Sequence, residues 1–116
     1  MHVVSDQLVT TVEHHDSHTV LRLTGELDLA TQGPFRAQAI DLLVAGHVHL
    51  VLELSELTFV DSTGLGAFIG LRRRAHALQG SLTLVCPADA VMKVFTIVGL
   101  EKVFDIRTDL ESALAG

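Results

Sequence analysis

The sequence has few aromatic or reactive residues: its 116 positions include no Trp, no Tyr and one Cys. The single cysteine, Cys86, excludes an internal disulfide, and we expect a buried, reduced thiol. Without Trp and Tyr, the stacking platforms of single-strand nucleic-acid binders are missing. Residues 1–6 lack the basic region of a secretory signal, and no segment approaches the roughly 20 apolar residues of a membrane span. We therefore expect a cytoplasmic protein without membrane insertion.

Positive charge is also scarce. The chain has 8 Lys and Arg against 14 Asp and Glu, a formal net charge of −6 and a pI of about 5.5. This balance argues against direct nucleic-acid binding, which needs cations to neutralise phosphates. The one basic cluster, residues 72–74, falls late in a predicted helix, where cations favour the negative end of the dipole. It is either a solvated face or a partner contact.

What the chain does have is the composition of a globular protein. Hydrophobic residues make up 48% and charged residues 19%. A chain of this length can bury one core but is too short for a two-domain enzyme. We therefore predict a single domain spanning residues 1–116, with no repeat or linker.

The hydrophobic pattern predicts four strands and a fifth at an edge. Residues 8–13 and 19–25 form a hairpin around a polar turn at 14–18, and Leu21 and Leu23 alternate with polar residues. Residues 48–54 are apolar and β-branched, which is typical of a central strand covered on both faces. Residues 55–60 are predicted as a link. Residues 81–86 form a further strand and 103–107 a short edge strand.

Helices are predicted between these strands from their start and stop signals. The first has Pro34 in its opening turn and ends at Gly46. The second begins near Ser62 and ends at Gly80, with a predicted core face of Gly64, Ala67, Phe68, Leu71, Ala75 and Leu78. The third runs from about residue 88 to Gly99, after Pro87, with one face formed by Val91, Val94, Phe95 and Val98. Asp109 caps the last. The fold class is α/β, a small mixed sheet of four to five strands covered by about four helices.

The most informative stretch is Asp61-Ser62-Thr63-Gly64-Leu65-Gly66, at the start of the second helix. Short polar side chains at this point accept hydrogen bonds from the free N–H groups of the first turn. Each glycine costs the helix roughly 1 kcal/mol relative to alanine. That cost is explained if a backbone, a partner surface or a phosphate approaches closely. A simple helix cap remains the alternative.

A second stripe on this helix has two interpretations. Leu65, Ile69, Arg72 and His76 lie beside the core face, and the first two are apolar. They are either the margin of the core or a partner contact, since exposed apolar residues next to a polar motif often mark an interface.

Enzyme and cofactor motifs are weak or absent. The glycines at 64, 66 and 70 are spaced one residue too far for a dinucleotide fingerprint, and there is no P-loop. No G-x-S-x-G elbow surrounds Ser62, as a serine hydrolase would need. His14, His15 and His18 fall in a predicted turn without a further ligand, so no metal site is predicted and their role stays open. We expect no catalytic residue and no cofactor.

Three runs resemble the anti-sigma-factor antagonists of the STAS domain family. They are Leu23-Thr24-Gly25-Glu26-Leu27-Asp28, Leu50-Val51-Leu52-Glu53-Leu54, and residues 57–66, which contain D-S-T-G-L-G. Residues 99–104 are also similar to the C-terminal region of that family. The likeness covers nearly the whole chain, in order and with matching spacing.

The resemblance implies a regulatory switch in a bacterial cell and not an enzyme. Family members bind an anti-sigma factor that is a serine kinase and so release the sigma factor. The kinase phosphorylates the motif serine, here Ser62, which ends binding, and a serine phosphatase restores it. Asp28 and Asp61 match the acidic positions of the family. The implied partner surface comprises Gly25, Glu26, Asp28, Asp61, Ser62, Thr63, Gly64, Leu65, Ile69 and Arg72.

Elementary electrostatics agrees with this cycle. A phosphoserine carries about −1.5 to −2 charge, which a helix N-terminus accommodates, so we expect loss of binding without unfolding. The resemblance also implies an alternative function, as an accessory subunit of a membrane transporter or of another signalling complex.

Overall fold

The structure, a computed structural model, describes residues 2–5, 7–86 and 90–115. The strands are β1 (His2–Ser5), β2 (Leu8–His15), β3 (His18–Leu27), β4 (His49–Val60), β5 (Ser81–Val85) and β6 (Asp105–Arg107). The helices are α1 (Gln32–Val44), α2 (Ser62–Ala77), α3 (Ala90–Ile97) and α4 (Leu110–Ala115), with a 3₁₀ turn, η1 (Leu100–Lys102). Among the described residues, no helix has the length and apolar character needed to cross a membrane.

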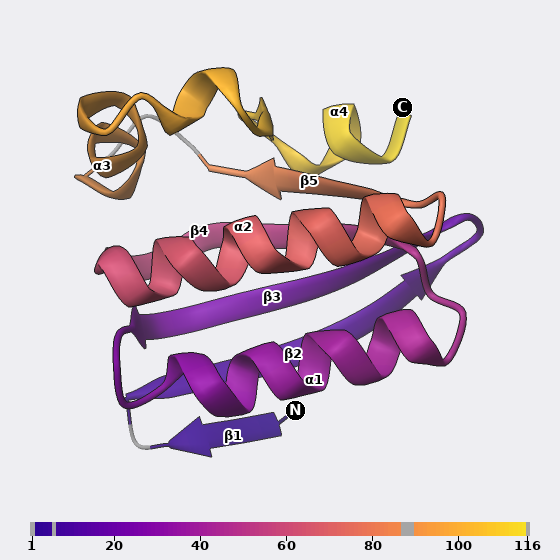
Figure 1. Ribbon diagram of the computed structural model, residues 1–116, viewed down its shortest axis with the longest axis horizontal. Helices are drawn as coiled ribbons and strands as arrows, with labels where there is room; N and C mark the ends of the chain where they lie inside the picture. Colours follow the sequence, from indigo (N-terminus) through magenta and orange to yellow (C-terminus); the bar gives the residue numbers. More distant parts are fainter. Residues whose placement is uncertain (1, 6, 87–89, 116) are drawn as a thin grey trace.

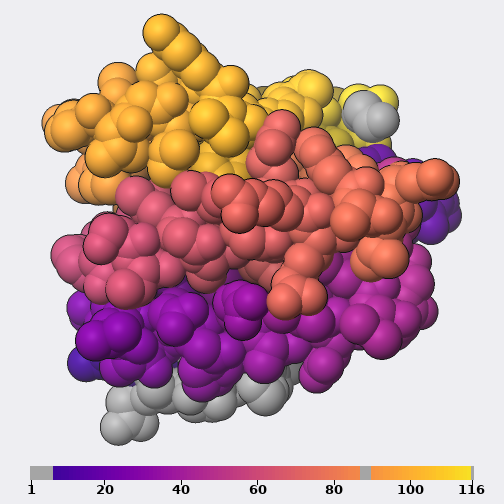
Figure 2. Space-filling model, viewed as in Figure 1, coloured from indigo at the N-terminus to yellow at the C-terminus, as the bar shows by residue number. Residues whose placement is uncertain are grey.

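The strands form one mixed sheet in sequence order, β1 to β6. β1, β2 and β3 pair antiparallel, and β3, β4, β5 and β6 pair parallel. α1 connects β3 to β4 and α2 connects β4 to β5, and the two helices lie side by side along the sheet (Figure 1). Figure 2 shows this face as neighbouring bands of α1, α2 and the C-terminal segment. The predicted α/β class with a mixed sheet and about four helices is confirmed.

The main core lies between the sheet and the helices α1, α2 and α3. Alternate strand residues such as Leu21, Leu50 and Leu52 face it. A chain of phenylalanine rings ties the helices together. Phe68 packs edge-on against Phe35 at 5.9 Å and stacks on Phe95 at 6.1 Å. Since each ring is fully buried, this row fixes how the three helices sit relative to one another.

The opposite face of the sheet is covered in part by α4. Ala113 packs against Val20, Val51 and Val85 in a second, smaller cluster. Residues 50–54 are all buried, which confirms that the central strand is covered on both faces. Elsewhere this face is polar, and Arg22 bonds Glu13 at 2.8 Å and Glu53 at 3.2 Å. The sheet therefore has one helical face and one partly open polar face.

Three strand predictions need correction. The structure has six strands because β1 precedes the first one predicted. The predicted turn at 14–18 is shorter, because His14 and His15 end β2 and His18 begins β3. The predicted link at 55–60 continues β4, because Gly25 to Leu27 keep pairing with it, although the register shifts twice. That extension carries the chain to the motif at Asp61.

The helix ends are mostly as predicted. Gly46 and Gly99 have φ of 103° and 77°, the left-handed caps expected. At the end of α2, however, Gln79 takes the left-handed conformation, with φ of 61°. Gly80 is required for another reason, because a Cβ there would lie 1.9 Å from the Val48 carbonyl oxygen.

Side-chain placement was predicted well in the core and less well at helix ends. The predicted core face of α2 is buried except for Leu78, which lies beyond the helix and is 48% exposed. Val98 likewise follows α3 and is exposed, so its assignment to the α3 core face was wrong. Cys86 is buried, as expected. Pro87 and the predicted helix start at residue 88 lie outside the described residues.

Candidate functional site

Two loops meet at one edge of the sheet. β3 and β4 run parallel, and their last residues, Leu27 and Val60, are paired. Parallel strands place their carboxyl ends at the same edge, so the β3–α1 loop lies beside the start of α2. A backbone hydrogen bond of 3.2 Å from the Asp61 N–H to the Leu27 carbonyl joins them. The two motifs singled out from the sequence are therefore neighbours in space.

Asp61 is the N-cap of α2 and also holds the neighbouring loop. Its Oδ1 accepts the Thr63 hydroxyl at 2.6 Å and the Gly64 N–H at 2.9 Å. Its Oδ2 accepts the N–H of Leu29 at 3.2 Å. Burial raises the pKa of Asp61, but the Thr63 hydroxyl and the backbone N–H groups outweigh it, so the pKa lies below its ordinary value. The site favours a charged carboxylate.

This hydrogen-bonding pattern predicts an acid-sensitive cap. Because the pKa of Asp61 is lowered by folding, its charge stabilises the fold above the unfolded-state pKa, and this contribution is lost as pH falls through the folded value. In Asp61→Asn a neutral oxygen can still cap the helix. Denaturant melts should show wild type more stable than Asp61→Asn at pH 7, with the difference shrinking below about pH 4.

Asp61→Ala, which has no cap, should lose about 1 kcal/mol at pH 7. A difference between wild type and Asp61→Asn that stays constant from pH 7 to pH 3 would show that the carboxylate charge contributes nothing.

Ser62 is the first residue of α2 and is exposed. Within the described residues no group bonds its hydroxyl, whereas the neighbouring Thr63 hydroxyl is engaged by Asp61. The prediction that a short polar residue of the motif caps this helix is confirmed: Asp61 is the cap, and Ser62 faces solvent at the positive end of the helix dipole. A modifying enzyme can reach the Ser62 hydroxyl without opening the fold.

The β3–α1 loop is held by Asp28 and Thr31. Asp28 Oδ1 accepts the N–H groups of Ala30 at 3.0 Å and Thr31 at 3.1 Å. The Thr31 hydroxyl donates to the Glu26 carbonyl at 3.0 Å and accepts the Asp28 N–H at 2.9 Å. Thr31 is fully buried and was missed from the sequence, although an Asp three residues before a Thr at a helix start is a recognisable turn signal.

Gly25 is required by the fold at this edge. Its φ is 119°, and a Cβ there would lie 2.0 Å from the Gln7 carbonyl oxygen. The next residue, Glu26, is exposed and donates its N–H to the same carbonyl at 2.8 Å. The Thr58 hydroxyl donates to the Gly25 carbonyl at 3.0 Å. Gly25 therefore lets the β1–β2 turn, β3 and β4 come into contact, and the neighbouring Glu26 presents its side chain to solvent.

Two exposed apolar side chains border the site and were not predicted. Leu29, in the β3–α1 loop, is 72% exposed, and Phe59, near the end of β4, is 46% exposed. A sequence signal existed, because each lies next to a polar motif residue in a segment that ends at this edge. Exposed apolar residues beside a polar motif are typical of binding surfaces.

The two glycines of the motif have different roles, which a pair of variants separates. A Cβ on Gly64 would lie 2.8 Å from Val60 Cγ2 and 3.0 Å from Leu27 Cγ, whereas Gly66 has nothing within 4 Å. We expect Gly66→Ala to stabilise the domain by about 1 kcal/mol through helix propensity. Gly64→Ala should destabilise it by about 1–3 kcal/mol through overpacking.

Thermal melts of both variants measure this, and equal shifts of the same sign would contradict the packing difference. The affinity of Gly66→Ala for a binding partner, compared with that of wild type, then tests whether the partner's backbone comes close to the exposed turn.

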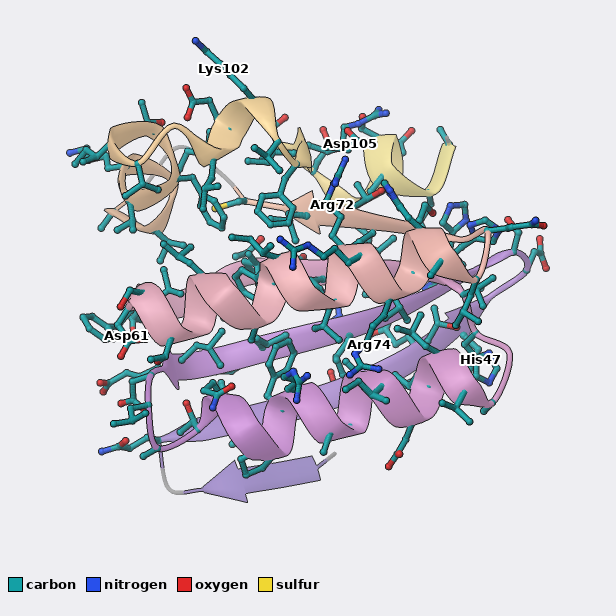
Figure 3. All side chains as sticks on the ribbon, in the orientation of Figure 1. His47, Asp61, Arg72, Arg74, Lys102 and Asp105 are labelled. Carbon is teal, nitrogen blue, oxygen red and sulfur yellow. The ribbon has the colours of Figure 1, made fainter. Side chains whose placement is uncertain are left out.

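The side stripe of α2 divides between core and surface. Leu65 is only 6% exposed and packs in the core, so it forms part of the core margin, while Ile69 is half-buried against it. Arg72 is half-buried, and Figure 3 shows Arg72 and Arg74 extending to opposite sides of α2. The basic residues therefore do not form one patch. Of the predicted contact residues, Leu65 offers a partner little surface in this structure.

The described histidine side chains lie away from Ser62. His76 is in the last turn of α2, about 21 Å along the helix from Ser62. Figure 3 shows His47 at the opposite end of the fold from Asp61, and His14, His15, His18 and His49 gather there with it. Within the described ranges no group of three or more His, Cys, Asp or Glu side chains is arranged to hold a metal ion.

Fold and site together define a small α/β domain that presents a capped helix start and flanking apolar side chains on its surface. The sequence matches the STAS domain model over residues 10–113, and the chain therefore belongs to the STAS domain family.

Among relatives, the chain is 31% identical over 104 residues to the anti-sigma F factor antagonist of Paenibacillus polymyxa, covering 89% of each chain. It is 27% identical over 103 residues to the anti-sigma-B factor antagonist of Bacillus subtilis, covering 89% of this chain and 94% of the relative.

Solved structures agree. An anti-sigma factor antagonist from Mycobacterium paratuberculosis superposes with a TM-score of 0.86 at 26% identity, over 95% of this chain and 93% of the other. The phosphorylated form of the Bacillus cell fate determinant SpoIIAA superposes with a TM-score of 0.69 at 28% identity, over 90% of this chain and 96% of the other.

Proposed function

We propose that this protein is an anti-sigma-factor antagonist: its unphosphorylated form binds an anti-sigma factor with serine kinase activity and releases the sigma factor. Phosphorylation of Ser62 ends binding, and a serine phosphatase reverses it. Such a protein acts in the cytoplasm and catalyses no reaction itself. Support comes from its family, from relatives that are anti-sigma factor antagonists, and from a structural neighbour that exists in a phosphorylated form.

The observation that carries the proposal is the geometry of Ser62. Its hydroxyl is exposed at the first residue of α2, beside a cap that Asp61 completes without it. A phosphate at this position is stabilised by the helix dipole and by hydrogen bonds from the free N–H groups of the first turn. It breaks no hydrogen bond of the described fold. The modification therefore changes the surface rather than the structure.

The surface around Ser62 explains why a phosphate would stop binding. Leu29 in the β3–α1 loop and Phe59 near the end of β4 give the partner apolar anchors. The hydrogen bond from the Leu29 N–H to Asp61 holds the first of them beside Ser62. An interface that packs on these anchors excludes water from Ser62. Placing about two negative charges in such a dry interface costs several kcal/mol.

The remaining predicted contact residues differ in how much side chain they present on this surface. Glu26, Asp28, Thr63 and Gly64 lie at the rim or beneath the turn, and Gly25 shapes the edge. Ile69 and Arg72 extend the surface along α2, whereas buried Leu65 acts through the core.

A direct binding experiment tests the proposal. Purified unphosphorylated protein is titrated by calorimetry into the complex of the anti-sigma kinase and sigma factor from its host, and free sigma factor is measured by gel filtration. We expect saturable binding and stoichiometric release of sigma factor. No binding, together with stable co-purification of the chain with a membrane transport protein, would replace the proposal with the accessory-subunit function.

A further inference from the structure

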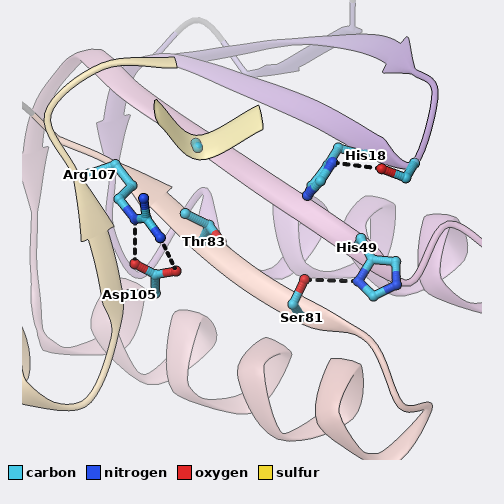
Figure 4. Close-up of a pocket in the computed structure, with 8 residues that line it drawn as sticks. His18, His49, Ser81, Thr83, Asp105 and Arg107 are labelled. Carbon is cyan, nitrogen blue, oxygen red and sulfur yellow. Dashed lines mark hydrogen bonds and ion pairs between the residues drawn. The ribbon is translucent and has the colours of Figure 1, made fainter. Parts of the chain in front are cut away.

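The structure holds a second feature, remote from Ser62, that the proposed function does not use. At the amino-terminal ends of β4 and β5, on the sheet face opposite α1 and α2, lies a cavity of about 380 Å³. Its lining comprises Ser17, His18, His49, Ser81, Thr83, Asp105, Arg107 and Ala113. Figure 4 shows Arg107 and Asp105 on one side of the cavity, His18 and His49 on the other, and Thr83 between them. Cavities of this size accept small organic molecules.

The lining is rich in hydrogen-bond donors. His18 and His49 each have Nδ1 bonded to a hydroxyl, of Ser17 at 3.1 Å and of Ser81 at 2.9 Å. The hydroxyls thus orient both rings and leave Nε2 of each for a ligand. Their ring centroids are 6.0 Å apart, close enough for both to contact one small group.

Arg107 adds a guanidinium group that is held in place by its neighbours. Its Nε donates to Asp105 at 2.7 Å and its Nη1 to the Ser112 hydroxyl at 3.1 Å, so the guanidinium is held between β6 and α4. Asp105 is the one acidic residue among the described lining residues, and its charge is balanced by that of Arg107.

Thr83 contributes a further hydroxyl to the lining. Thr83 is only 7% exposed and lines the cavity between Arg107 and His49 (Figure 4). Among the described residues no group bonds its hydroxyl, which is therefore available to donate to a ligand oxygen in the cavity.

From this arrangement we infer that the cavity binds a small oxyanion, a phosphate or carboxylate group, through His18, His49, Thr83 and Arg107. An oxyanion accepts several hydrogen bonds at once and gains most where donors are charged. This site is separate from the Ser62 surface, because it lies at the other end of β4 and on the other face of the sheet. The inference does not depend on the proposed function.

The test is an NMR titration of the full chain at pH 6.5 with inorganic phosphate, with succinate as the carboxylate probe and sodium chloride at matched ionic strength as the control. We expect saturable shifts of the Ser81 and Thr83 amides with phosphate or succinate and none with chloride, and the tighter-binding probe identifies the anion class. In the double variant His18→Gln, His49→Gln the dissociation constant should rise about tenfold or more.

The matched control is His76→Gln, which removes an exposed histidine outside the lining and should change affinity less than about twofold. Ser81→Ala removes the hydroxyl that orients His49 but keeps the ring, so it provides a milder second variant. An unchanged amide spectrum shows that each variant folds. Absence of saturation with both anions, equal affinity in the double variant, or shifts centred on residues 72–74 would each overturn the inference.

Discussion

Ser62→Glu is expected to abolish partner binding while leaving the domain folded. The affinity for the anti-sigma kinase should fall at least about 100-fold, or roughly 2.7 kcal/mol, because a charge must be desolvated beside Leu29 and Phe59. The melting temperature should change by no more than a few degrees, because an acidic residue in the first turn favours the helix dipole. Calorimetric titration and a thermal melt measure the two effects on one preparation.

Two variants control for this substitution. Ser62→Ala removes the phosphoacceptor but adds no charge, so it should bind like wild type and resist the kinase. Ala37→Glu adds the same charge at an exposed position on α1, away from the switch, and should leave affinity unchanged. A Ser62→Glu protein that binds normally, or one that unfolds outright, would show that the charge does not act through the interface.

Gly25→Ala is expected to give the largest stability loss of any single methyl addition at the site. The φ of 119° costs a residue with a Cβ about 1–3 kcal/mol. The overlap with the Gln7 carbonyl, at 2.0 Å, adds about 1–3 kcal/mol because backbone must move. We expect a loss of about 3 kcal/mol or more and a melting temperature lower by about 12 °C or more.

Two other glycines distinguish the cost of the positive φ from the cost of the steric overlap. Gly46 shares a positive φ of 103°, but a Cβ there would have no atom within 4 Å, so Gly46→Ala should cost only about 1–2 kcal/mol. Gly70 has neither constraint and lies inside α2, so Gly70→Ala should be neutral or stabilising by up to about 1 kcal/mol. Equal losses at Gly25 and Gly46 would show that backbone strain alone matters and that contact with Gln7 does not.

The parts of this structure that depend on local chemistry could be predicted from the sequence. A short polar residue before a helical pattern predicted the cap at Asp61, and glycines after helical patterns predicted the ends at Gly46 and Gly99. The amide of residue 112 bonds Asp109 Oδ1 at 2.7 Å, so the predicted cap of α4 is also confirmed. Each involves only neighbours in the chain, so the physical cause is visible in a few letters.

The parts that depend on distant contacts could not be predicted in this way. Gly25 and Gly80 are needed because the carbonyls of Gln7 and Val48 come close, and those contacts exist only after the strands pair. The exposure of Leu29 and Phe59, and the gathering of five histidines and Arg107 at one end of the sheet, likewise follow from topology. The fold brings the residues of a binding surface together from distant parts of the chain, so local sequence patterns do not predict which residues form it.

The most direct measurement of the central claim is made on the protein purified from its own host, under resting and stressed conditions. Intact mass and phosphopeptide mapping, before and after serine phosphatase treatment, are paired with a binding titration of each form against the anti-sigma kinase. The account predicts a removable phosphate on Ser62 in one condition and binding only by the form that lacks it. An unmodified Ser62 in both conditions, or equal binding by the two forms, would contradict it.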